Sequence, residues 1–163
     1  MISDQDERWM REAIRVATQD CAEPEKSPIG AVLVRDGRLI ASGRNRTDDW
    51  TDATAHAEMV TFREAAKTGD APDFNGATLY ATLQPCGMCT MATIWTKVQR
   101  IVFGAGRDDV HRMYFEDRNL DTMDFVRDAY RDDLDIEGGC LRKECAQLCF
   151  RPDDVLESQQ TNL

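Results

Sequence analysis

The stretch TLQPCGMC at residues 82–89 organises this chain. A strand-like run, residues 77–83, leads into it, and a helical run begins at about residue 88. Pro85 suits such a strand-to-helix turn, because a proline at a helix start gives up no N–H group that the helix needs. Cys86 and Cys89 are then three residues apart in the first helical turn, on the same side. The positive end of the helix dipole lowers the pKa of thiols at this position, which prepares both for metal binding.

A His-Ala-Glu triplet that begins at His56 supplies what the two cysteines lack. His56 follows a turn-like stretch and opens a helical run, residues 57–67. A His/Cys/Cys set leaves the fourth position of a tetrahedral zinc ion open to water, as in catalytic sites. Glu58 would lie beside the metal without binding it and could move a proton from that water to a leaving nitrogen. This order of motifs resembles a known zinc-site pattern, H-x-E followed by P-C-x-x-C, and the resemblance implies that His56, Cys86 and Cys89 bind Zn²⁺ and that Glu58 is catalytic.

Each half of this pattern has another interpretation when taken alone. A Cys-x-x-Cys pair after a strand is also typical of a thioredoxin-like redox dithiol. Cysteine and histidine ligands also build structural zinc modules. Metal analysis separates these alternatives, because a protein without zinc that readily forms a disulfide would be a redox module.

The composition describes one domain, residues 1–163, with 42% hydrophobic and 31% charged residues. The net charge of −10 disfavours a nucleic-acid substrate, whereas a small neutral base needs no basic surface. No apolar run approaches the roughly 20 residues of a membrane span, and the acidic N-terminus does not resemble a signal peptide. Six cysteines in such a chain predict reduced thiols and a cytoplasmic location.

Periodicity predicts the remaining elements. A capping box at Ser3 precedes an amphipathic helix, and Asp36-Gly37 predicts a tight turn in a hairpin. The hairpin strands, three later strands and the last helix are expected at residues 29–34, 39–43, 77–83, 99–104, 133–137 and 141–150. Strands that alternate with helices predict an α/β fold whose sheet is covered on both faces, and the hairpin makes this sheet mixed.

Two segments between these elements are harder to interpret. Residues 107–131 are predicted to hold a short helix, a loop at 116–119 and a helix at about 122–130. His111 is expected to be a loop or surface residue, unless it takes part in the site. Trp50 lies in a predicted polar loop, where it could cover a pocket, stack on a ring or pack on the surface. Asn45 ends the second strand, and its amide can both donate to and accept from a base edge, unless it is only a turn residue.

These motifs resemble the cytidine-deaminase-like superfamily, whose zinc deaminases carry H-x-E followed by P-C-x-x-C. The resemblance covers nearly the whole chain and rests on residues 28–34, 43–46, 54–58 and 82–89. It implies a three-layer α/β/α sandwich with a mixed five-stranded sheet, a homodimer and one zinc ion. It also implies that Asn45 and the backbone of Ala57 hold the base.

Within this superfamily, the chain is similar to the branch that holds tRNA adenosine deaminases, guanine deaminases and microbial cytosine deaminases. The sequence YFED at residues 114–117 resembles a Phe-Asp-Asp stretch of guanine deaminases, which implies that Asp117 contacts the base. Trp95 falls where those enzymes have Ile-Tyr-Trp, although their C-terminal tyrosine has no counterpart here. We expect a substrate-binding role for Trp95 as well.

Other positions point toward or away from tRNA. The sequence RDDVHR at residues 107–112 replaces the Lys-Thr-Gly-Ala-Ala-Gly-Ser type loop of the tRNA enzymes, and Gln84 replaces a frequent glutamate. The last helix looks more like that of the tRNA enzymes. From the sequence we expect a free guanine-type base as substrate, followed by cytosine or a related heterocycle and then by adenosine in tRNA.

Overall fold

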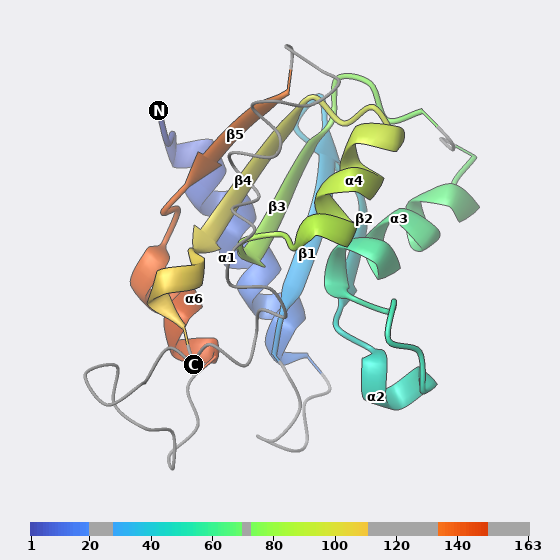
Figure 1. Ribbon diagram of the computed structural model, residues 1–163. Coiled ribbons are helices and arrows are strands. Elements are labelled where there is room, and N and C mark those ends of the chain that lie inside the picture. Colours follow the sequence, from blue (N-terminus) through green and yellow to red (C-terminus); the bar gives the residue numbers. More distant parts are fainter. Residues whose placement is uncertain (20–27, 70–72, 111–133, 150–163) are drawn as a thin grey trace.

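The computed structural model describes residues 1–19, 28–69, 73–110 and 134–149. In this part of the chain the strands form one five-stranded sheet in the order β2-β1-β3-β4-β5 (Figure 1). Their bounds are β1 (Gly30–Arg35), β2 (Arg38–Arg44), β3 (Thr78–Leu83), β4 (Arg100–Ala105) and β5 (Asp135–Gly138). Strand β1 pairs antiparallel with β2 and β3, whereas β3, β4 and β5 run parallel. The predicted mixed sheet is confirmed.

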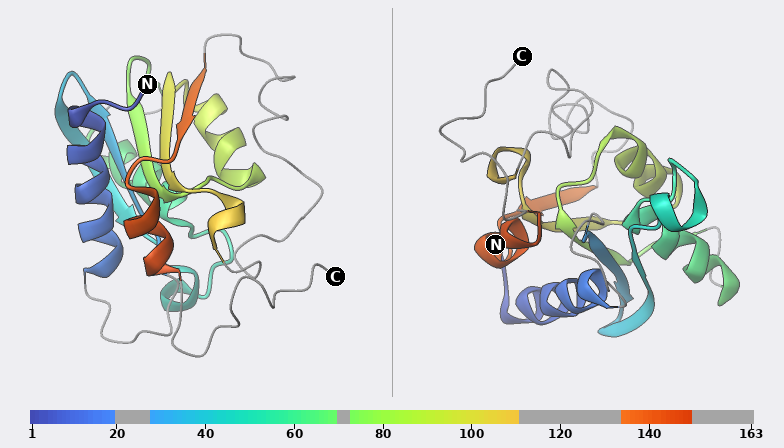
Figure 2. Two further views of the ribbon diagram at one scale, coloured as in Figure 1. Left: turned by 90° about the vertical axis from the view of Figure 1, so that its left-hand side faces the viewer. Right: turned by 90° about the horizontal axis from the view of Figure 1, so that it is seen from below.

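Helices cover both faces of this sheet. Their bounds are α1 (Asp4–Thr18), α2 (Thr47–Trp50), α3 (Ala57–Lys67), α4 (Gly87–Trp95), the 3-10 helix η1 (Arg107–Asp109) and α6 (Arg142–Leu148). Helices α1 and α6 pack on one face, and α3 and α4 lie on the other (Figure 2). The arrangement is the expected three-layer α/β/α sandwich.

Strand β1 shows why the sheet needs two covering layers. Successive side chains of a strand point to opposite faces. Ala31 and Leu33 accordingly pack in the core under α3, whereas Val32 and Val34 pack in the core under α1. All four are buried, which is typical of a central strand covered on both sides.

The predicted capping box of the first helix and the predicted tight turn of the hairpin are both confirmed. The side chain of Ser3 accepts from the backbone N–H of Asp6, and the Asp6 carboxylate accepts from the Ser3 N–H, which closes the capping box of α1. Asp36 and Gly37 have φ of 52° and 69°, as a two-residue turn with the twist of a hairpin requires.

One short element differs from the prediction. The stretch expected to be a polar loop contains α2, a single turn of helix. Its Asp49 carboxylate accepts hydrogen bonds from Arg44 and Arg46, and Thr51 ends the turn in the left-handed region at φ 50°. One helical turn is too short to show periodicity, so only these contacts define it.

The elements predicted for residues 107–131 can be compared with the structure only at the start of this segment. Helix η1 begins this segment, and the predicted elements from 111 onward, with His111 and Asp117, lie outside the described residues. None of the helices that the structure describes is long and apolar enough to cross a membrane.

Candidate metal and catalytic site

The candidate site lies where α3 and α4 begin. His56 is the N-cap of α3, and Cys86 is the N-cap of α4, with extended backbone at both. Helix α3 packs closely on β2 because Gly43 has no side chain: a Cβ there would lie 2.8 Å from the backbone nitrogen of Thr61. The N-termini of α3 and α4, with their positive dipole ends, thus lie at the same end of the sheet, where β2 and β3 end.

His56, Cys86 and Cys89 come together as predicted, and we call them the metal triad. His56 Nδ1 lies 3.7 Å from Cys86 Sγ and 3.7 Å from Cys89 Sγ, and the three ligand atoms all lie within 4.8 Å of one another. Zinc bonds of about 2.1 Å to nitrogen and 2.3 Å to sulfur, at tetrahedral angles, separate those atoms by about 3.6 Å. The residues therefore fit a zinc ion with one open position.

The two thiols of the metal triad differ in acidity. The neighbouring Cys89 thiol lowers the pKa of Cys86 to about 4, and the nearby His56 reinforces this effect against burial. The pKa of Cys89 is raised by the same bond to Cys86, by burial and by the nearby Glu58 carboxylate. A thiolate at the N-terminus of a helix is a ready metal ligand.

Glu58 lies beside the metal triad, in the first turn of α3, and is only 4% exposed. Its Oε2 accepts from Cys89 Sγ at 3.4 Å. Burial raises the pKa of Glu58, the charge of Cys86 adds to this effect, and a backbone hydrogen bond and His56 oppose it. A carboxyl group with a raised pKa that is no member of the triad has the position that a proton carrier needs.

The predicted substrate residues occupy different places. Ala57 is buried directly after His56, and Asn45 is half-buried after β2, where its Nδ2 donates to Thr47 Oγ1 at 3.1 Å. Trp95 is 78% exposed at the far end of α4, about 9 Å along the helix axis from Cys89 at 1.5 Å per residue. Its contact with substrate stays a prediction, as does that of Asp117, which lies outside the described residues.

The sequence did not predict that Gln84, just before the Cys86 turn, contacts the start of η1. Its buried Oε1 accepts from the backbone N–H of Arg107 at 3.2 Å. Asp109 in turn accepts from the Gly106 N–H at 2.7 Å and from the guanidinium of Arg142 in α6. The motif drew attention to Gln84, but no local pattern predicts a partner 23 residues away.

Comparison with known proteins agrees with this geometry. Residues 3–105 match the family described as the cytidine and deoxycytidylate deaminase zinc-binding region. The tRNA-specific adenosine deaminase of Buchnera aphidicola is 34% identical over 91% of this chain and 93% of its own length.

Solved structures show the same fold. A structure from a study of tRNA:A34 deaminases, which edit A to I at the wobble position, has a TM-score of 0.71 and 32% identity and covers 86% of this chain and 98% of its own. A guanine deaminase from Nitrosomonas europaea has a TM-score of 0.75 and 25% identity, with 91% and 84% covered. These relatives favour neither a redox dithiol nor a structural zinc module. The chain belongs to the cytidine and deoxycytidylate deaminase zinc-binding family and is a zinc-dependent deaminase.

Proposed function

We propose that this protein deaminates adenosine in tRNA to inosine and releases ammonia. The observation that carries the proposal is the similarity to a tRNA-specific adenosine deaminase over nearly the full length of both chains. The related wobble-position deaminase is likewise covered over 98% of its length. This similarity favours the substrate that the sequence alone placed last, because the identity to the tRNA-specific enzyme is 34%, against 25% for the solved guanine deaminase.

The residues of the site have distinct roles in this reaction. The metal triad would hold zinc, which lowers the pKa of a water molecule at its open position. Glu58 would take a proton from the attacking water and give it to the ring nitrogen while the water oxygen bonds to the amine-bearing carbon; it would then move the second water proton to the amine, which leaves as ammonia. The Asn45 amide and the Ala57 backbone hold the base edge. Burial of Glu58 keeps bulk water away from the proton it carries.

The net charge of −10 disfavours binding of nucleic acid by the surface as a whole, but it still allows a local contact with RNA. Two partly exposed arginines lie at this place: Arg46, whose side chain is 32% exposed, begins the segment between Asn45 and His56 and pairs with Asp49, and Arg63 of α3, whose side chain is 41% exposed, pairs with Asp52 of the same segment. Contacts between arginines and phosphates supply much of the affinity of proteins for nucleic acids. Binding of tRNA by this protein should therefore weaken as salt is raised.

The test is an ammonia-release screen with the zinc-loaded protein. The substrates are a tRNA anticodon stem-loop with adenosine at position 34, the same stem-loop with guanosine there, and free guanine, cytosine and adenosine. Release from the adenosine stem-loop alone, with inosine in the product, is the expected result. Release from a free base with none from the stem-loop rejects the proposal.

A free guanine-type base is the second candidate, and cytosine or a related heterocycle is a third. The likeness to the solved guanine deaminase and the sequence at 114–117 favour guanine. If guanine is the substrate, Asp117→Asn should lower its deamination strongly, because a carboxylate accepts from ring and amino N–H groups that an amide matches only in part. Normal guanine deamination by Asp117→Asn would reject this role.

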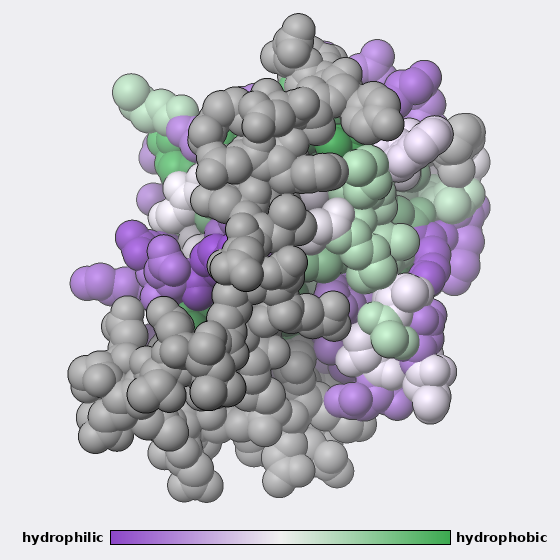
Figure 3. Space-filling view, in the orientation of Figure 1, coloured by the Kyte–Doolittle hydropathy of each residue, from purple (hydrophilic) through white to green (hydrophobic). Residues whose placement is uncertain are grey.

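We also propose that the protein is a homodimer, as its resemblance implies, with the exposed side of α4 in the contact. Trp95 is exposed there, Met88 and Met91 are half-buried, and Figure 3 shows apolar side chains gathered over this helix. Large exposed apolar patches are typical of protein interfaces. Trp95→Arg should therefore shift the sedimentation of the protein from dimer to monomer, and an unchanged dimer would exclude this face.

A further inference from the structure

Residues 46–55 form an arm that leaves the sheet after Asn45 and returns at His56, and we call this segment the arm. Its α2 stands apart from the layers of the sandwich (Figure 1). The two ends of the arm meet where the backbone N–H of Arg46 donates to the Ala55 carbonyl at 2.8 Å. The residue expected to hold the base therefore lies directly before this junction, and a member of the metal triad lies directly after it.

Arg44 braces this junction from inside the protein. It is the last residue of β2 and is only 9% exposed. Its Nη1 donates to the Asn45 carbonyl at 3.1 Å, and its Nη2 donates to Asp49 Oδ2 in α2 at 2.8 Å. One rigid guanidinium thus fixes both the backbone of Asn45 and the helix of the arm, which a single amine could not do with the same geometry.

This arrangement is costly for stability alone. A buried cation loses its hydration, and an apolar side chain would fill the same space without that loss. In addition, the buried Nε of Arg44 has no hydrogen-bond partner among the residues that the structure describes. A buried group that is incompletely satisfied calls for an explanation, and the contact with Asn45 supplies one.

We propose that Arg44 is a positioning residue: by holding the backbone carbonyl of Asn45, it places the Asn45 side-chain amide, which donates to Thr47, where the substrate base meets the metal triad. Arg44 acts through Asn45 and does not touch the reacting atoms. The inference rests on the proposed function only in that Asn45 holds the base, whichever base that is. If Arg44 works in this way, its removal should have no further effect once the Asn45 amide is gone.

A double-mutant cycle tests this coupling. We would measure kcat and KM for the wild type, Arg44→Met, Asn45→Ala and the double variant, with the substrate that the wild type deaminates in the screen above. Arg44→Met should lower kcat/KM by about 10- to 100-fold, mainly through KM, because a small misplacement of a binding group is costly. Zinc content should stay at the wild-type value. The double variant should match Asn45→Ala within about twofold.

Two results would overturn the proposal. One is a loss of less than twofold in Arg44→Met. The other is a double variant whose loss is the product of the two single losses, since residues that act independently have multiplicative effects on kcat/KM. If the wild type acts on a free base but not on tRNA, the proposed function fails, and the cycle is run with that base.

Arg63 offers a matched control. It also contacts the arm, through Thr54 Oγ1 at 3.0 Å and Asp52 Oδ2 at 3.6 Å, but has no contact with Asn45 among those that the structure shows. The loss in Arg63→Met, whatever its size, should multiply with that of Asn45→Ala. The same non-additivity for Arg63 would mean that the arm as a whole, and not Arg44, positions the amide.

A second variant covers the case in which Arg44→Met loses zinc or unfolds. Arg44→Lys keeps the buried cation but offers one amine to two acceptors. We expect a partial loss of kcat/KM in Arg44→Lys, again absent in combination with Asn45→Ala. Wild-type activity in Arg44→Lys would show that the forked contact has no role.

Discussion

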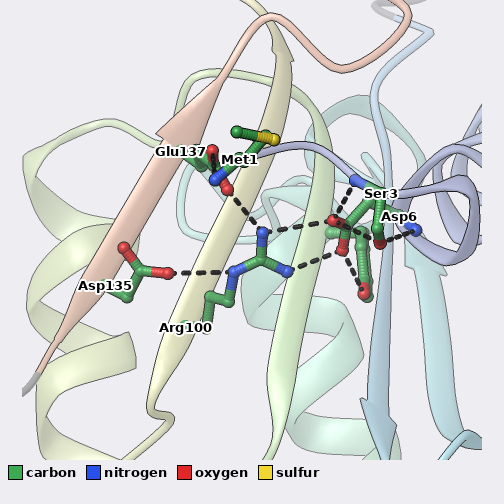
Figure 4. Close-up of polar contacts among 7 residues, drawn as sticks. Met1, Ser3, Asp6, Arg100, Asp135 and Glu137 are labelled. Carbon is green, nitrogen blue, oxygen red and sulfur yellow. Dashed lines mark hydrogen bonds and ion pairs between the residues drawn. The ribbon is translucent and has the colours of Figure 1, made fainter.

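Two clusters of polar side chains, each partly buried, lie at opposite ends of the sheet and differ in how their groups are satisfied. The first, at the amino end of β4, surrounds Arg100 and is called the Arg100 cluster; it also contains Asp6, Asp135 and Glu137 (Figure 4). Tyr80, which donates to Asp6, completes it. The second is the metal triad with its neighbouring carboxyl group, beyond the carboxyl end of β3.

The groups of the Arg100 cluster satisfy one another. Arg100 donates to Asp6 Oδ1 at 2.6 Å, to Glu137 Oε2 at 2.6 Å and to Asp135 Oδ2 at 3.0 Å, while Tyr80 donates to Asp6 at 2.9 Å. Burial alone would raise the pKa of Asp6, but the hydrogen bonds from Arg100 and Ser3 outweigh it and hold this pKa well below its usual range. The cluster thereby ties α1 to β4 and β5.

The metal triad has the opposite character. Each of its three ligand atoms carries a lone pair that a metal ion can accept, so an ion can complete the bonding of all three. The carboxyl ends of parallel strands, where open α/β sheets bind their ligands, place it at the functional edge. The comparison teaches that a cluster of charged side chains does not by itself identify a functional site. The oppositely charged groups of the Arg100 cluster stabilise the fold, whereas the metal triad, whose members are all metal ligands, marks the catalytic site.

The largest expected effect is that of removing a triad member. His56→Ala should contain little zinc and release no ammonia above background, because two thiolates alone do not complete the site. Metal analysis and the ammonia assay measure both. Cys140→Ala removes a buried thiol that is not part of the triad and should keep its zinc. Zinc at the wild-type level in His56→Ala would contradict the assigned ligand set.

Removal of the proton carrier should come next. Glu58→Gln should keep zinc and the thermal stability of the wild type but lower kcat by about 10²- to 10⁴-fold, because an amide cannot transfer the proton. The control is Glu64→Gln, which changes a partly exposed acid on the same helix that pairs with Lys67. Wild-type kcat in Glu58→Gln would end the proposed mechanism.

The Arg100 cluster should respond in stability rather than in activity. Arg100→Met leaves the buried Asp6 without its cation, so we expect the free energy of unfolding to fall by about 3 kcal/mol. Urea denaturation measures this loss, and kcat/KM should stay within about twofold of the wild type. The exposed pair of Arg11 and Glu7 is the control, since Arg11→Met should cost less than about 0.5 kcal/mol.

The smallest expected effect is a pH dependence of the stability that Asp6 contributes. Because the pKa of Asp6 is lower in the folded chain than in the unfolded chain, its contribution to stability is full above about pH 4 and is lost as the pH falls further. The stability difference between the wild type and Asp6→Asn, followed by urea denaturation, should therefore narrow below pH 4. Loss of zinc in acid affects both proteins alike and cancels in this comparison. A difference that stays constant down to pH 2 would show that Asp6 titrates normally.

Local rules explain why much of the site could be predicted. His56 was expected to open a helix over residues 57–67, and α3 has those bounds, because the turn before it and its apolar spacing are both local. The Cys86 turn follows from Pro85 and the strand before it. Neither inference needed a contact across the fold.

Other features could not be predicted, because they depend on which strands become neighbours. Asp6 and Arg100 are 94 residues apart in the chain and meet only because α1 packs across β1 and β3. The sequence indicated only that Arg44 ends a strand. Its hydrogen bonds to the Asn45 carbonyl and to Asp49 depend on how residues 46–55 are arranged in the fold.

The sequence by itself determined the chemistry of this protein: the ligand types, the acid beside them and the helices that begin there are encoded in short spacings. Only the tertiary structure decided which charges neutralise each other at the amino end of β4 and which donors are left to hold an ion. The physical reason is that periodicity and capping act between residues a few positions apart, whereas the pairing of buried charges requires strand order, and strand order follows from the packing of the whole core.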